Sequence, residues 1–192
     1  MRKLTNADIK DLREYERERD GFVAEIIALK KKRRIALGDM MTIVFENAAT
    51  MRFQIQEMAR AERMLRDEQI AHEIEVYNEL IPADGELSAT LFIEINDPEA
   101  LRYWLPRLVG IEDYVKFVVG DAVVGAEELN ADRLTREDIT STVHYLRFAF
   151  TPEVQQGFAT GPVRLIVDHP EYPVDVTLSD EQRDEVVGDF AA

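Results

Sequence analysis

The chain contains no cysteine. This absence excludes disulfide bonds, thiolate zinc sites, cysteine-ligated iron–sulfur clusters and cysteine nucleophiles as properties of this chain. Because the sequence has three histidines, a metal site would have to combine them with carboxylates. A metal cofactor is therefore possible, and the cofactor's identity is left open.

The sequence also lacks a long apolar run. No stretch approaches the roughly 20 residues that a membrane-spanning helix needs. Residues 1–12 carry early charges and no apolar segment of the kind that a secretory signal requires. We therefore expect a cytoplasmic protein that has no membrane partner.

Basic residues are scarce, with 23 lysines and arginines against 38 acidic residues and a formal charge of −15. A field of this sign repels nucleic acid and anionic membranes over roughly 8 Å at physiological salt, so no nucleic-acid partner is expected. The exception is the basic run Lys30–Arg34, which we interpret as the C-terminal end of a helix, where cations complement the helix dipole. An acidic partner or an anionic ligand is the alternative interpretation.

Length and composition indicate a globular protein. The 192 residues are 46 % apolar, which is enough for one well-packed core. We expect residues 1–192 to form a single domain, with a mainly helical half at 1–83 and a sheet-rich half at 84–192.

Helical spacing dominates the first half. Thr5 and Asp8 resemble a capping box, and apolar residues follow at helical intervals up to the basic run. Asp20 and Gly21 interrupt this pattern and suggest a division into two helices. Residues 35–37 and 41–45 are typical of two short strands.

Residues 45–82 predict a helix pair. Residues 50–57 alternate as a strand would, yet the same residues also form a helical stripe. We favour a helix because helix formers dominate 54–66 and Thr50 is a plausible N-cap. A short link to a second helix ending at Pro82 favours an antiparallel pair.

The second half reads as strands with short helices between them. Leu87–Ile95 alternates clearly, and residues 127–141 are polar and typical of a surface loop. Further strands are expected at 114–119, 122–126, 143–150, 163–167 and 174–178. The predicted fold class is α+β: N-terminal helices with a helix pair, followed by a mainly antiparallel sheet with two or three short helices.

Several phrases spread over the chain carry a resemblance to a known family. They are KKKRRIALG (30–38), FENAATMRFQIQEMARAER (45–63), YNELIP (77–82), ELSATLFIEI (86–95) and DHPEY (168–172). Together they resemble the bacterial family known as domain of unknown function 3501. The resemblance supplies no catalytic residues. It implies an accessory role beside redox or peroxide-handling enzymes, including rubrerythrin-like and iron–sulfur proteins.

Glu62 stands out because it falls on the apolar stripe of the first predicted helix of the pair. A buried carboxylate must find a partner or change its protonation state. It can form a structural ion pair with a neighbouring arginine, or it can bind a metal or transfer protons. Glu57 and Arg60 lie three residues apart and can pair on the helix surface. The catalytic candidates are therefore Glu57, Arg60 and Glu62.

Polar side chains of the helix pair and of the strand that follows it can line a pocket. The ligand-binding candidates are Gln54, Tyr77, Asn78, Thr90 and Glu94. This interpretation needs the polar face of the strand to turn inward. The alternative is that this face is solvated.

The histidines are the remaining metal candidates. His72 and Glu75 share one helical face and resemble part of a helical metal site, although the second copy that a di-iron site requires is missing. The alternative is a solvated acidic face. His144 starts a strand and is expected to point toward the core edge, and His169 lies in a turn. Their spacing does not predict that they converge.

Three functions follow as hypotheses. The first is an accessory or interaction protein that forms a small homo-oligomer through its N-terminal helices, with a redox protein as the partner that the resemblance implies. The second is a metal-binding protein or metalloenzyme that uses Glu57, Glu62 and His72. The third is a small-molecule sensor with a pocket between the helix pair and the sheet.

Overall fold

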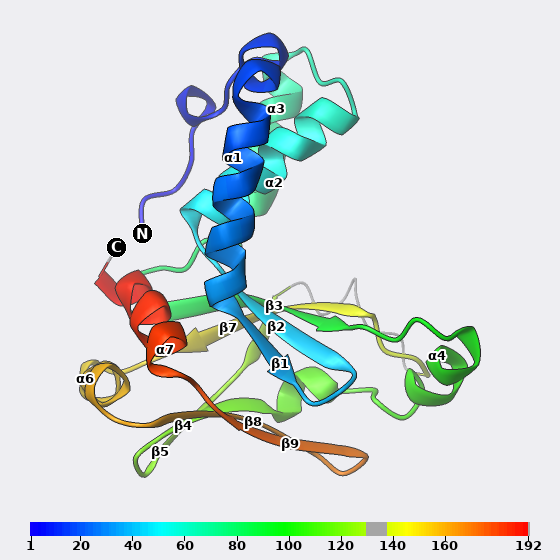
Figure 1. Cartoon of the computed structure of the whole chain (residues 1–192), viewed down its shortest axis with the longest axis vertical. Helices are drawn as coiled ribbons and strands as arrows, with labels where there is room; N and C mark the ends of the chain where they lie inside the picture. Colours follow the sequence, from blue (N-terminus) through cyan, green and yellow to red (C-terminus); the bar gives the residue numbers. More distant parts are fainter. Residues whose placement is uncertain (130–137, 192) are drawn as a thin grey trace.

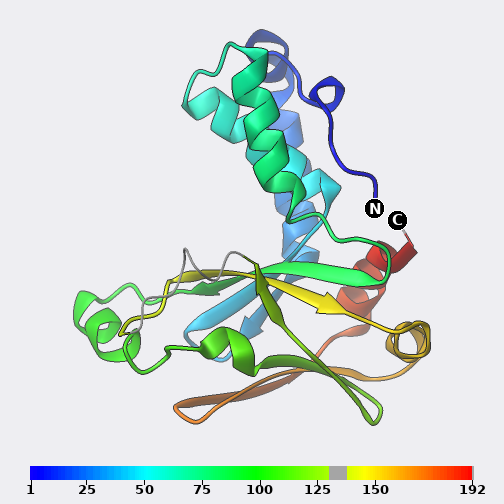
Figure 2. The same ribbon diagram turned by 180° about the vertical axis from the view of Figure 1, so that it is seen from behind.

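A computed structural model of the chain describes residues 1–129 and 138–191. A layer of N-terminal helices stands on two antiparallel sheets that pack face to face (Figure 1), and Figure 2 shows the same arrangement from behind. The α+β class is therefore confirmed, with the helices preceding most of the strands. Among the described residues, no helix combines the length and the apolar character that crossing a bilayer requires.

The helical layer contains a short 3-10 helix, η1 (Asn6–Asp8), and three α-helices: α1 (Leu12–Arg33), α2 (Ala48–Ala61) and α3 (Asp67–Asn78). The capping box of Thr5 starts only η1. Asp11 caps α1 by accepting from the backbone N–H groups of Arg13 and Glu14, at 2.9 Å each. The suggested division at Asp20 and Gly21 is wrong, because α1 runs through both residues and packs along α2.

Residues 50–57 belong to a helix, as we favoured. The N-cap of α2 is Asn47 rather than Thr50, and its side chain accepts from the backbone of Ala49 at 3.0 Å and of Thr50 at 3.1 Å. Met51 and Ile55 are buried against residues of α3 and of the loop after it. The helical stripe rather than the local alternation therefore decides which side chains are inside.

The strands form two sheets. The five-stranded sheet has the order β1-β2-β3-β7-β6, and the four-stranded sheet has the order β5-β4-β8-β9, with every neighbouring pair antiparallel. The strands are β1 (Arg34–Leu37), β2 (Met41–Glu46), β3 (Glu86–Ile93), β4 (Val115–Val119), β5 (Ala122–Gly125), β6 (Glu127–Leu129), β7 (Val143–Ala149), β8 (Val163–His169) and β9 (Tyr172–Thr177).

The short strands expected at 35–37 and 41–45 are confirmed as β1 and β2, and both belong to the five-stranded sheet. One feature differs from the sequence prediction. The predicted loop at 127–141 begins with strand β6, and Thr140 within it is buried. Residues 130–137 of this predicted loop lie outside the described part of the chain.

The main core fills the space between the sheets. Strand residues of alternating burial contribute Leu91, Phe117, Leu146 and Phe148, because every second side chain of a strand points to the same face. The ring of Phe117 lies 5.0 Å from that of Phe148 between centroids, in the edge-to-face arrangement that aromatic pairs prefer.

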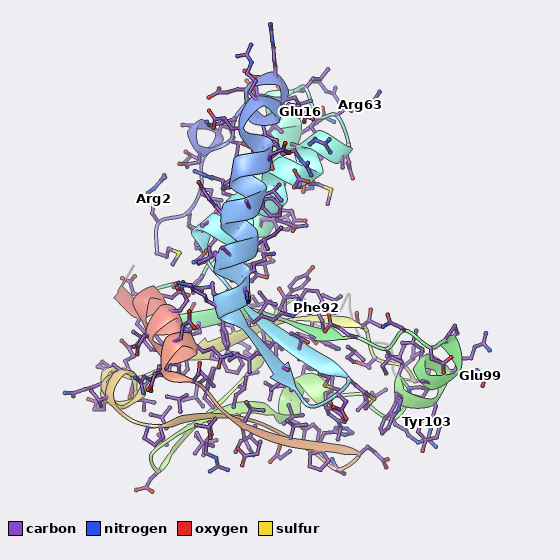
Figure 3. The ribbon with its side chains drawn as sticks, in the orientation of Figure 1. Arg2, Glu16, Arg63, Phe92, Glu99 and Tyr103 are labelled. Carbon is purple, nitrogen blue, oxygen red and sulfur yellow. The ribbon has the colours of Figure 1, made fainter. Side chains whose placement is uncertain are left out.

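Short helices lie at the two ends of the sheets. They are α4 (Pro98–Trp104), η2 (Ile111–Tyr114), α6 (Pro152–Thr160), α7 (Asp180–Val187) and η3 (Gly188–Ala191). Figure 1 places α6 and α7 at one end and α4 at the other. Figure 3 shows Glu99 and Tyr103 of α4 near the outer tip of the molecule, away from the helical layer.

Residues 1–10 form an N-terminal strap that lies across the helix pair. Asn78 holds the strap with its carboxamide, which accepts from Leu4 N at 2.8 Å and donates to Leu4 O at 3.0 Å. Gln56 makes the same two bonds to the backbone of Lys10, at 2.7 and 3.2 Å. These two amides fix the strap in place and bury Leu4 in a second, smaller core.

Candidate metal site

Glu62, the acid on the predicted inner stripe, is exposed. It is the C-cap residue of α2, and the next residue, Arg63, has a left-handed backbone with φ of +53°. The helix therefore ends before the stripe reaches Glu62, and Leu65 beyond it is 80 % exposed. The expectation of a buried acid at Glu62 is wrong.

Glu57 and Arg60 tie α2 to α1. Glu57 accepts from the hydroxyl of Tyr15 at 2.7 Å and from two nitrogens of Arg19 at 2.8 Å each. The Arg19 hydrogen bond, with Tyr15 adding a smaller contribution, lowers the pKa of Glu57 although partial burial opposes this. Arg60 pairs with Glu16 of α1, with 2.8 Å between Nε and Oε2. These contacts hold the two helices together.

Of the ligand-binding candidates, Gln54 and Tyr77 contact each other, whereas Asn78, Thr90 and Glu94 bind other residues. Asn78 holds the N-terminal strap, and burial raises the pKa of Tyr77 although a hydrogen bond with Gln54 opposes this. Thr90 is buried and donates to Glu46 at 2.9 Å. Glu94 is exposed and pairs with Arg34 at 2.5 Å. The polar face of β3 thus turns inward at Thr90, whereas Glu94, which follows the strand, is solvated.

The histidines do not converge as a group of three. His72 and Glu75 are exposed on α3. His169 is 6 % exposed, and its Nδ1 accepts from the backbone N–H of Glu171 at 3.2 Å. His144 is fully buried, as its strand position predicted. Of the described residues, the group of histidines and acids that could share one ion consists of Glu112, Glu128 and His144.

Three separate segments bring these residues together. His144 alternates in β7 with buried Leu146, so it points into the space between the sheets. Glu128 lies in β6 directly across from Leu146 and diagonally from His144. Glu112 comes from η2, which leads into β4 of the four-stranded sheet. The site therefore lies at one margin of the main core, between the two sheets.

The three side chains are close and shielded from solvent. Nδ1 of His144 is 2.5 Å from Oε1 of Glu128 and 3.6 Å from Oε2 of Glu112. The side-chain exposures of His144, Glu128 and Glu112 are 0 %, 4 % and 11 %. Two carboxylates with so little solvent need a proton or a compensating positive charge.

The hydrogen bonds of the other ring nitrogen of His144, Nε2, determine the tautomer of the imidazole. Nε2 lies 3.1 Å from the carbonyl oxygen of Ser141 and 3.0 Å from the hydroxyl of Thr140. Because a carbonyl oxygen only accepts, the hydrogen-bond network assigns a proton to Nε2. In the neutral ring, Nδ1 is then a lone-pair donor that faces both carboxylates. Metal-binding histidines commonly have this second hydrogen bond to a carbonyl group.

Glu128 has an acceptor atom without a partner. Its Oε2 is buried, and no described residue forms a hydrogen bond with it. Burial raises the pKa of Glu128, although the attraction of His144 opposes this shift. A proton or a cation between the three groups would satisfy this oxygen. One imidazole nitrogen and two carboxylates form a donor set that suits Mn²⁺, Fe²⁺ or Zn²⁺.

Sequence reasoning missed Glu112 and Glu128. A signal for Glu128 exists, since the period-two pattern of Ala122, Val124 and Ala126 continues to it and predicts the same inward face. Glu112 lies in the four-residue helix η2, which is too short for a periodic pattern to indicate the direction of its side chain.

Comparison with solved structures finds a protein of unknown function from Burkholderia pseudomallei, 33 % identical, with a TM-score of 0.91. The match covers 98 % of this chain and 99 % of that chain. A comparison with curated proteins finds no match. The family model described as "Protein of unknown function (DUF3501)" matches residues 3–190. The resemblance seen in the sequence is thereby confirmed, and the chain belongs to the DUF3501 family.

Proposed function

We propose that this protein binds one first-row divalent metal ion between its two sheets. The ligands are Nδ1 of His144 and the carboxylates of Glu112 and Glu128. The observation that carries the proposal is the buried, unpartnered Oε2 of Glu128 beside an imidazole that is oriented to offer Nδ1. The imidazole nitrogen favours Mn²⁺, Fe²⁺ or Zn²⁺ over Mg²⁺ and Ca²⁺, which prefer oxygen ligands.

An ion at this site joins parts of both sheets. Glu128 and His144 belong to the five-stranded sheet, whereas Glu112 is connected through η2 to the four-stranded sheet. The low exposure of the three side chains leaves little room for a large substrate. We therefore favour a metal-dependent accessory protein over an enzyme that acts on a macromolecule. Iron or manganese would agree with the association with redox enzymes that the family resemblance implies.

The test is metal binding by chelator-treated full-length protein. Calorimetric titration with Mn²⁺, Fe²⁺ under anaerobic conditions, or Zn²⁺ should give one site. At a metal concentration of a hundred times Kd, binding adds about 2.7 kcal/mol of stability. For a chain of this size this corresponds to a rise in Tm of roughly 5–11 °C. Mg²⁺ should give a much smaller shift.

Glu128→Gln is the informative variant, because it keeps the shape of the side chain and removes the charge. We expect its metal affinity to fall at least tenfold, while its circular dichroism stays native. His72→Gln is the matched control, since His72 is exposed and belongs to the competing helical candidate. Absence of uptake of all three metals, or an equal loss in both variants, would refute the proposal.

A further inference from the structure

A cavity of about 270 Å³ lies in the helical layer, between the N-terminal strap, α1 and α2. It involves none of the residues of the metal site. Its lining includes Tyr15, Gly21, Phe22, Glu25, Arg52 and Gln56. Pockets that bind drug-sized ligands usually have volumes of about 300–1,000 Å³. This cavity is slightly smaller, so a matching ligand would be small.

The floor of this cavity is held in place by hydrogen bonds. Tyr15 and Gln56 are each 2 % exposed. The hydroxyl of Tyr15 donates to Glu57, and the carboxamide of Gln56 bonds to both backbone groups of Lys10. All of these polar groups have partners within the protein, so the cavity is preformed and a ligand need not reorganise its floor.

Gly21 borders the cavity from the middle of α1. A glycine inside a helix is less favourable than alanine, because its backbone loses more conformational freedom on folding. A Cβ atom placed at Gly21 would meet nothing within 4 Å, and Gly21 is not among the glycines with positive φ. Neither packing nor backbone geometry therefore requires glycine here. What the glycine does provide is open space beside the cavity.

Five charged residues line the cavity, and three of them form ion pairs, including Asp8, which pairs with Arg2. The guanidinium of Arg52 lies 4.6 Å from the centroid of the Phe22 ring, which orients it beside the apolar wall. Lys10 pairs with Glu18, which also lines the cavity. Within residues 1–129 and 138–191, by contrast, neither Arg52 nor Glu25 forms an ion pair.

We infer that this cavity binds a small zwitterion with an apolar side chain, of the α-amino acid type. The carboxylate of the ligand pairs with Arg52, and its ammonium group pairs with Glu25. Its side chain packs on Phe22 and Tyr15, over the space that Gly21 leaves open. This inference is independent of metal binding, and it places a ligand within the helical layer rather than between the helix pair and the sheet.

The test uses L-phenylalanine and L-leucine as probes of the full-length protein, by ligand-observed NMR and calorimetry. We expect at least one of them to bind at least tenfold more tightly than 3-phenylpropionate, which lacks the ammonium group, and than phenethylamine, which lacks the carboxylate. L-Aspartate, which lacks the apolar side chain, should be equally poor. No binding of either probe, or equal binding of the truncated compounds, would overturn the inference.

Two substitutions at Gly21 locate the site. Gly21→Ala should stabilise the helix and retain binding, whereas Gly21→Leu should keep the fold and abolish binding by filling the mouth of the cavity. Arg52→Gln should weaken binding at least tenfold, and Arg17→Gln, an exposed arginine of α1 outside this cavity, is its matched control. Unchanged binding in Gly21→Leu or in Arg52→Gln would overturn the inference.

Discussion

Replacement of Arg33 by methionine should destabilise the protein strongly. Arg33 is the last residue of α1, and its side chain is buried where the C-terminal segment packs against this helix. The side chain is 1 % exposed. Its Nε donates to Phe45 O at 2.8 Å, its Nη2 donates to the carboxylate of Asp189, and its Nη1 donates to Glu185 at 3.3 Å. Methionine fills part of the volume of the arginine stem and donates none of these bonds.

The expected cost follows from what is left without a partner. Removing one member of a buried ion pair costs about 3–5 kcal/mol, because the other charge stays buried. The carbonyl of Phe45 also loses its donor, and one buried acceptor without a partner costs about 1–3 kcal/mol. These costs overlap, so we expect about 3–5 kcal/mol in total. Tm should fall by roughly 6–20 °C, and urea denaturation should report the same loss.

Two further variants distinguish the stability lost with the ion pair from a general effect of substitution at this end of the helix. Lys32→Met removes a neighbouring cation that is 50 % exposed and should cost at most about 0.5 kcal/mol. The double variant Arg33→Met with Asp189→Leu removes the stranded charge and should be more stable than Arg33→Met alone. A cost below about 1 kcal/mol for Arg33→Met, or a double variant less stable than the single one, would refute the reasoning.

The same substitution has a predictable pH dependence. Burial raises the pKa of Asp189, and the attraction of Arg33 opposes this shift. A carboxyl group whose folded pKa is raised contributes stability at low pH, and this contribution is lost as the pH rises through the folded pKa. Without Arg33 the pKa rises further. The deficit of Arg33→Met should therefore be smaller at about pH 5 than at about pH 8, and equal deficits would contradict this.

Three other substitutions test local features of the fold. Asn78→Ala frees both backbone groups of Leu4, so it should cost about 1–3 kcal/mol and speed amide exchange in the N-terminal strap; unchanged exchange would contradict this role. Gly38 and Gly120 both have positive φ, but the space around them differs. At Gly38 an added Cβ would lie 2.4 Å from the Tyr172 hydroxyl oxygen, whereas at Gly120 it would meet nothing within 4 Å. Thermal denaturation should therefore show a loss of about 2–4 kcal/mol for Gly38→Ala against about 1–2 kcal/mol for Gly120→Ala, and equal losses would show that the close contact does not matter.

The helix at residues 50–57 shows where local pattern is sufficient. Met51 and Ile55 belong both to the strand-like alternation and to the helical stripe that the sequence offers. Both side chains are buried on one face of α2. Side chains four residues apart on a helix share a face whatever the rest of the chain does, because backbone hydrogen bonds within the helix set that geometry. The inward direction of His144 was predictable in a similar way, because successive side chains of a strand point to opposite faces of the sheet.

The helix ends show where local pattern fails. The stripe that placed Glu62 inside assumed that α2 continues, whereas the chain turns at Arg63. At Gly21 the error was the opposite, since α1 continues through a residue that weakens helices. The pairing of α1 with α2 through contacts such as Arg19 to Glu57 compensates for this weakness, and it joins residues far apart in the sequence.

The sequence by itself determined the α+β class, the family, the order of most elements and the buried faces of the regular ones. These depend on repeats of two or of 3.6 residues that are local to each segment. Only the tertiary structure decided that His144 meets Glu112 and Glu128, and that Gly21 opens onto a cavity beside Arg52. The order of strands in a sheet and the packing of one helix on another bring together residues that no local period relates.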